Sequence, residues 1–146
     1  MVKYTTRKPP SNSMRMAPTV GQLIPILLDG IPETQAIYLF GSHARGQSHP
    51  DSDLDLAILA KTKLPATLLW ETAQRLASHA GVDVDLVNLG EASTVMQMQI
   101  ITADQRLYCK DERACGDFED LVFSSYARLN EERAEILRDI AERGRV

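Results

Sequence analysis

The sequence predicts a small α/β (α+β) domain, in which helices flank a mixed β-sheet and a long helix forms the C-terminal end. Short apolar runs, which suit buried strands, alternate with longer segments of helical periodicity. Hydrophobic residues make up 44% and charged residues 25%, a balance typical of globular proteins. The 146 residues leave room for one core. We therefore expect a single domain over residues 19–146, preceded by a flexible tail at residues 1–18.

Three elements make up the first half of this domain. Residues 20–28 carry apolar side chains at helical spacing, although Pro25 weakens or kinks this helix. Residues 36–40 form a short apolar run that stops at Gly41, which indicates a buried strand. Residues 53–59 form a second strand beyond a polar loop. We expect these two strands to be neighbours, as in a hairpin.

The alternation continues in the second half. Residues 64–80 favour a helix, and Gly81 is placed to end it. Residues 82–89 predict a third strand, residues 91–103 a helix and residues 106–109 a brief strand.

The last element predicted is one amphipathic helix over residues 117–143. At about 1.5 Å per residue it spans roughly 40 Å, which is longer than a small sheet needs for cover. Its apolar positions, three or four residues apart, are Phe118, Leu121, Val122, Tyr126, Leu129, Ile136, Leu137 and Ile140.

Composition excludes several classes of protein. A formal net charge of −4 gives no general attraction to DNA or RNA. Cys109 and Cys115 provide neither a disulfide framework nor a zinc pattern, so we expect ordinary thiols. No apolar run approaches the roughly 20 residues of a membrane span, and the basic start lacks the apolar region of a secretory signal. We therefore expect a cytoplasmic protein without a membrane segment and without direct DNA binding.

The Asp-x-Asp pair at the start of the second strand carries the chemistry. Asp53 and Asp55 project from the same face of a strand, about 6.5 Å apart along the chain. Their mutual repulsion must be relieved by a cation or by a raised pKa. Carboxylate oxygens at this separation suit Mg²⁺, whose remaining ligands are commonly water and substrate phosphates. The pair therefore predicts a site for a metal and a phosphate.

The third strand supplies further acids with the same alternation. Asp83 and Asp85 both have the parity to reach the face of Asp55, and neighbouring strands lie only about 4.8 Å apart. Two-metal phosphoryl chemistry uses a shared carboxylate cluster, with ions about 4 Å apart. We favour Asp85, which lies deeper in the apolar run, as third ligand or as the base for the attacking hydroxyl. Asp83 is the alternative.

The end of the first strand suits phosphate binding. Gly41 lets backbone N–H groups approach a phosphate closely, and the Ser42 hydroxyl can donate to a phosphate oxygen. Arg45 adds a charge-assisted contact to a triphosphate, unless it only pins the loop to Asp51. A Gly-Ser alone is usually a turn, and an Asp-x-Asp alone is usually a solvated face. Their combination with a third acid favours a nucleotide site.

These residues resemble the signature of the DNA polymerase β-like nucleotidyltransferase superfamily. The match consists of Gly41-Ser42, ten intervening residues and Asp53-x-Asp55. The fuller string GSHARGQSHPDSDLDL is similar to the minimal nucleotidyltransferases (MNT), whose MntA-type antitoxins are paired with HEPN-domain partners. The resemblance implies the polymerase β-like fold, phosphate contact by Ser42, and Mg²⁺, as two ions, bound by the aspartates including Asp85.

The resemblance also implies an activity. MntA-type antitoxins use ATP to add AMP to a tyrosine of a HEPN ribonuclease toxin and so silence it. The chain lacks a separate acceptor domain, so we expect the acceptor to be a toxin protein that the helix over residues 117–143 helps to dock. Two alternatives remain open: an antitoxin that acts by binding and occlusion alone, and an adenylyltransferase for a small molecule of the aminoglycoside type.

Overall fold

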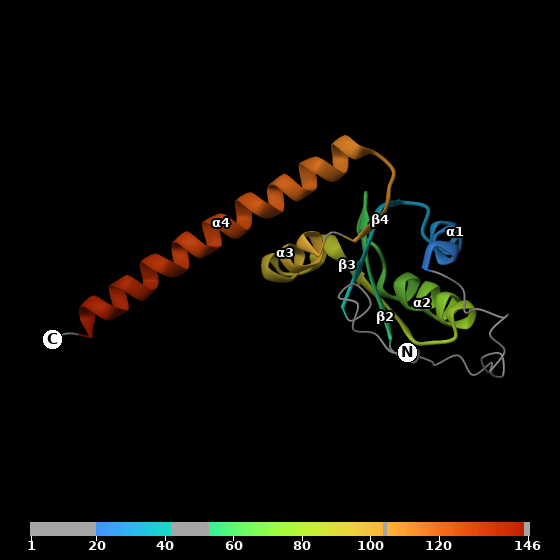
Figure 1. The fold of residues 1–146 in the computed structure, drawn as a ribbon, viewed down its shortest axis with the longest axis horizontal. Helices are drawn as coiled ribbons and strands as arrows, with labels where there is room; N and C mark the ends of the chain where they lie inside the picture. Colours follow the sequence, from blue (N-terminus) through green and yellow to red (C-terminus); the bar gives the residue numbers. More distant parts are fainter. Residues whose placement is uncertain (1–19, 42–52, 104, 145–146) are drawn as a thin grey trace.

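The computed structural model of the chain describes residues 20–41, 53–103 and 105–144. Its centre is a four-stranded sheet with the strand order β3-β2-β1-β4 (Figure 1). β1 runs antiparallel to β2 and β4, and β2 runs parallel to β3. The predicted mixed sheet and the pairing of the first two strands are confirmed. The strands are β1 (Thr34–Phe40), β2 (Leu54–Ala60), β3 (Val84–Asn88) and β4 (Arg106–Cys109).

Helices cover both faces of the sheet, because the strands are apolar on both sides. Leu56 and Ile58 of β2 belong to one core cluster, and Ala57 between them belongs to another. The first cluster is closed by α1 (Val20–Gly30) and α2 (Ala66–Ala80), and the second by α3 (Thr94–Thr102) and α4 (Glu112–Arg143). A short 3₁₀ turn, η1 (Leu89–Glu91), joins β3 to α3.

Local sequence accounts for several helix limits. α1 continues through Pro25, which is exposed. α2 ends at Gly81, as predicted, because this glycine adopts a left-handed φ of 79°. α4 begins after Asp111, whose carboxylate accepts a hydrogen bond from the N–H of Arg113 at 3.0 Å.

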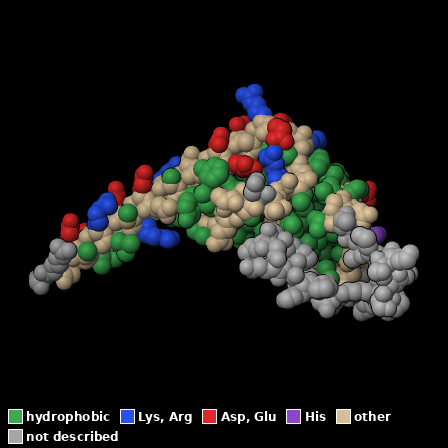
Figure 2. Space-filling view, in the orientation of Figure 1, with side chains coloured by type: hydrophobic (Ala, Val, Ile, Leu, Met, Phe, Trp, Pro, Cys, Tyr) green, Lys and Arg blue, Asp and Glu red, His purple; other side chains and the backbone are tan. Residues whose placement is uncertain are grey.

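Helix α4 is longer than predicted and leaves the body of the domain. It begins at Glu112 rather than at residue 117, because Gly116 does not interrupt a helix already capped by Asp111. Cys115 and Val122 are its buried residues, and the helix then projects outward (Figure 1). Exposed apolar side chains lie between charged ones along its length (Figure 2). They are Leu121, Phe123, Ile136, Leu137 and Ile140. Only the first half of α4 covers the core.

A polar cluster fixes the base of α4 to the sheet. The Tyr38 hydroxyl donates a hydrogen bond to Glu119 at 2.6 Å. Arg106 of β4 donates to Glu119 at 3.3 Å and to Glu112 at 2.6 Å. Burial and the hydrogen bond to Glu119 raise the pKa of the Tyr38 hydroxyl above its ordinary value. β1, β4 and α4 are therefore joined through charge-assisted hydrogen bonds.

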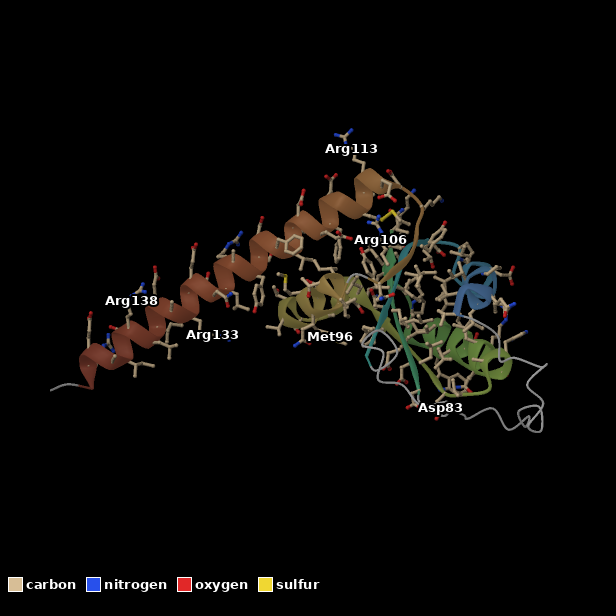
Figure 3. All side chains as sticks on the ribbon, in the orientation of Figure 1. Asp83, Met96, Arg106, Arg113, Arg133 and Arg138 are labelled. Carbon is tan, nitrogen blue, oxygen red and sulfur yellow. A yellow bond between two sulfur atoms is a disulfide. The ribbon has the colours of Figure 1, made fainter. Side chains whose placement is uncertain are left out.

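A disulfide joins Cys109 to Cys115 (Figure 3), so the expectation of ordinary thiols is wrong. Cys109 ends β4 and Cys115 lies in the first turns of α4, with Cα atoms 6.7 Å apart. This separation is within the range that a disulfide bridges. The sharp turn between strand and helix brings the two together, and a spacing of six residues gives no sign of that turn.

The predicted tail at residues 1–18 lies outside the described residues. Within the described ranges, no helix combines the length and the apolar character needed to cross a membrane.

Candidate active site

The predicted carboxylates come from two adjacent parallel strands. Asp55 of β2 pairs with Asp85 of β3, and Leu54 pairs with Val84. Directly paired residues share a face of the sheet about 4.8 Å apart. Asp53 directly precedes β2, two residues before Asp55. The face is the one that α3 and α4 cover, since Ala57 has the same parity. Asp55 and Asp85 therefore lie side by side at one end of this face, and Asp53 lies next to that end of β2.

The side chains differ in exposure. Asp53 and Asp85 are exposed, whereas Asp55 is half-buried. Among the residues that the structure describes, no three acidic, histidine or cysteine side chains already converge around one point as a metal site would. The strand register brings the aspartates close together, but their carboxylate oxygens do not converge on one point.

Gly41 lies directly against Asp55. Its φ of 76° is a left-handed conformation that L side chains rarely adopt. A Cβ atom added to Gly41 would collide with Oδ2 of Asp55 and lie 3.1 Å from its Cγ. Phe40, the preceding residue, pairs with Asp55 across the two strands. The predicted phosphate-binding glycine and the predicted metal-binding aspartate are therefore in contact, and their spacing along the chain carries no sign of this contact.

A cavity of about 600 Å³ opens beside Gly41 on the α3 face of the sheet. Its volume is within the range of small-molecule and cofactor sites, about 300 to 1,000 Å³. One wall is the end of β1 and the other is α3, where Met96 is labelled in Figure 3. The α3 positions read as an ordinary helix in the sequence, which carries no sign that they line a cavity. The lining residues are Phe40, Gly41, Met96, Gln99, Ile100, Thr102 and Ala103.

Asp83 is the alternative to Asp85 as the third acid. It precedes β3 beside the start of β2, where its carbonyl accepts a hydrogen bond from the N–H of Leu54 at 2.9 Å. In Figure 3 it lies at the end of the sheet farther from the start of α4. Its Oδ1 is buried and accepts no hydrogen bond within the described part of the chain. A buried carboxylate oxygen needs a donor or a cation, so this end of the sheet favours positive charge.

Two predicted site residues, Ser42 and Arg45, lie outside the described residues, as does Asp51. Their proposed contacts with phosphate therefore stay predictions. Gly41, by contrast, is described: it lines the cavity and has a left-handed backbone, but its contact with phosphate also stays a prediction.

Comparison with known proteins agrees with this geometry. The family model "Polymerase beta, Nucleotidyltransferase" matches residues 22–113. The curated protein adenylyltransferase MntA of Shewanella oneidensis is 41% identical over 121 residues, which cover 82% of this chain and 85% of MntA.

Solved structures of toxin–antitoxin complexes are also similar. A toxin–antitoxin structure with AMP-PNP contains a chain with 40% identity and a TM-score of 0.71, covering 84% of this chain and 99% of that one. The tri-AMPylated HEPN toxin of Shewanella oneidensis in complex with its MNT antitoxin gives 38% identity and a TM-score of 0.65, covering 82% and 93%. The chain thus belongs to the polymerase β-type nucleotidyltransferases, in the group that contains MntA.

Proposed function

We propose that this protein is an antitoxin that transfers AMP from ATP to a tyrosine of a cognate HEPN-type toxin. The observation that carries the proposal is the register of β2 and β3, which aligns Asp55 with Asp85 beside Gly41 and the cavity. The similarity to MntA, a protein adenylyltransferase, and to structures that hold a HEPN toxin supports the choice of acceptor. A cytoplasmic location belongs to the same proposal.

In this proposal the cavity binds the nucleotide and the aspartates bind the metal. The cavity, with Gln99 and Thr102 among its walls, takes the nucleoside, and Gly41 with Ser42 and Arg45 takes the phosphates. Asp53, Asp55 and Asp85 would hold Mg²⁺, which neutralises charge on the phosphates when it is bound. Their hard oxygen donors fit a small divalent cation, as does the buried oxygen of Asp83, which has no hydrogen-bond partner among the described residues.

The reaction forms one bond and breaks another at the α-phosphorus of ATP. The tyrosine oxygen attacks this phosphorus, the bond to the bridging oxygen of the β-phosphate breaks, and diphosphate leaves. The hydroxyl proton passes to a carboxylate, for which exposed Asp85 is the best placed because it borders solvent and pairs with Asp55. The chain's contribution is to orient the reactants and to supply charge where it develops.

The test is the mass of the toxin after incubation with this protein, ATP and Mg²⁺. We expect the toxin to gain the mass of one or more AMP groups. Asp53→Asn/Asp55→Asn and Asp85→Asn should abolish the gain. Glu33→Gln is the matched control, because Glu33 is an exposed acid before β1, at the other end of that strand from Gly41, and it should leave the gain unchanged.

The same variants separate the alternatives. If the toxin gains no mass and Asp53→Asn/Asp55→Asn still protects cells from it, the protein acts by occlusion. If AMP is transferred to a small molecule without any toxin present, the acceptor assignment is wrong. Omission of Mg²⁺ in the presence of a chelator should stop transfer, and addition of Mn²⁺ or Mg²⁺ identifies the ion that restores it.

A further inference from the structure

Two polar side chains, Gln99 and Thr102, stand in the α3 wall of the cavity beside Gly41. They are three residues apart on one helix, so they lie on the same side of it. Phe40, which also lines the cavity, pairs with Asp55 across β1 and β2, and paired residues share a face of the sheet. The cavity and Asp55 are therefore on the same face, with no strand between them.

The Thr102 hydroxyl has a hydrogen-bonding role that the helix itself fixes. It donates to the carbonyl of Met98 at 2.6 Å, and the carbonyl oxygen of Gln99 lies 3.4 Å away. A hydroxyl has one hydrogen and two lone pairs. Because the hydrogen is used inside α3, the oxygen keeps only the capacity to accept. A ligand in the cavity therefore meets Thr102 as an acceptor.

The C-terminal end of α3 adds to this acceptor character. Thr102 is the last residue of the helix and Ala103 is its C-cap, and both line the cavity. The last carbonyls of an α-helix lack helical partners, and this end carries a partial negative charge. It therefore favours a hydrogen-bond donor and disfavours an anion, which agrees with phosphates bound beside Gly41 instead.

Gln99 offers both hydrogen-bonding roles. Its side chain is exposed and makes no hydrogen bond to any other residue in the described ranges. Its amide can donate to one group and accept from another, and a rotation of the amide exchanges the two. It can therefore pair with the edge of a base whether that edge carries an amino group or a carbonyl. Gln99 adds affinity, whereas Thr102 can discriminate.

We propose that Thr102 at the end of α3 selects adenine by its 6-amino group and that Gln99 binds the ring beside it. This inference rests on the proposed function and names the base that its nucleotide site accepts. Adenine carries an amino donor at C6, where guanine and hypoxanthine carry a carbonyl acceptor. A carbonyl would face the lone pairs of Thr102 Oγ1, and both oxygens would stay unpaired. The apolar walls, among them Phe40 and Met96, suit the flat ring.

The first test compares ATP with inosine triphosphate (ITP) as donors for transfer to the toxin. ITP keeps the sugar and phosphates of ATP and replaces the 6-amino group by a carbonyl. Wild type should show a kcat/KM roughly ten-fold or more higher for ATP than for ITP. Thr102→Val, which removes the hydroxyl with little change of shape, should lose most of this preference, and Thr102→Ser should retain it. Thr67→Val is the matched control, because Thr67 is an exposed threonine of α2, on the other face of the sheet.

The second test separates affinity from discrimination. Gln99→Ala should raise the KM for ATP and for ITP by a similar factor and leave the KM for the toxin unchanged. Titration calorimetry with each nucleotide, in the absence of the toxin, should show the same pattern in the dissociation constants. A rise in the KM for the toxin instead would overturn the proposal, because the cavity would then hold the acceptor.

These outcomes are distinct from failure of the proposed function. If wild-type protein adds no nucleotide to the toxin, the activity is wrong, whatever Thr102 does. If wild type uses ATP and ITP equally well, or if Thr102→Val keeps the full preference for ATP, only the selection of the base is wrong. Circular dichroism checks that Thr102→Val is folded, and the comparison of ATP with ITP in wild type carries the test if it is not.

Discussion

Replacement of Gly41 by alanine separates the two roles that this glycine has in the structure. Its backbone is left-handed, with φ at 76°, and its missing side chain leaves room for the Asp55 carboxylate. Gly81 shares the first property without the second: its φ is 79°, and a Cβ added there meets nothing within 4 Å. Gly81→Ala is therefore a control for backbone strain alone.

The size of each effect follows from this difference. An alanine held in the left-handed region costs about 1 to 2 kcal/mol, so both variants should lose that much stability. At Gly41 the new methyl group must also displace the Asp55 carboxylate, on the order of 1 Å, and a misplacement of that size costs about a hundred-fold in rate. We expect Gly41→Ala to lose about a hundred-fold in AMP transfer and Gly81→Ala to lose almost none.

Two measurements on each variant complete the test. Urea unfolding gives the free energy of unfolding, and intact mass spectrometry of the toxin gives the rate of AMP transfer. Transfer of AMP by Gly41→Ala within three-fold of wild type would contradict a role for the contact with Asp55, and so would equal losses of activity in the two variants. Equal losses would mean that strain, rather than contact with Asp55, makes glycine necessary at this position.

Two contacts at the base of α4 can also be tested. Tyr38→Phe removes the hydrogen bond to Glu119 and should lower the free energy of unfolding by about 1 kcal/mol, as measured in urea at pH 8. Folding raises the pKa of the Tyr38 hydroxyl, so the contribution of this group to the free energy of unfolding is complete below about pH 10 and is lost as the pH rises further. Above pH 10, wild type should therefore lose more stability than Tyr38→Phe. Reduction of the Cys109–Cys115 disulfide should lower stability by about 2 kcal/mol for so short a loop, as seen by thermal unfolding with and without dithiothreitol. An identical melting temperature in both conditions would contradict that estimate.

The alternation of apolar and acidic residues in the strands was the basis of most correct predictions. It predicted that Asp55 and Asp85 share one face, and the pairing of β2 with β3 confirms this. The roles of Asp53, Asp55 and Asp85 in binding a metal stay predictions. The prediction worked because parity is a local property, and because apolar runs on both sides of each acid identify the strands. The approximate limits of α2 followed similarly from Gly81.

The features that escaped prediction depend on contacts between distant residues or on tight turns. Contact of Gly41 with Asp55 requires the paired geometry of β1 and β2, which composition and spacing do not encode. The early start of α4 depends on the cap at Asp111, and the disulfide depends on the turn that follows β4. Exposure of Trp70 was equally hidden, because a helical pattern marks an apolar face without stating which residues remain uncovered.

The parallel pairing of β2 with β3 has a consequence for how the protein is made. Two parallel strands need a crossover, and α2 with its flanking turns provides it here. Asp55 and Asp85 are neighbours in the sheet but thirty residues apart in the sequence, so Asp85 leaves the ribosome well after Asp55. Contacts between residues so far apart in the sequence form late in folding. Nucleotide binding must therefore await synthesis of β3 and of the α3 wall. A growing chain has no competent site until most of its domain has emerged.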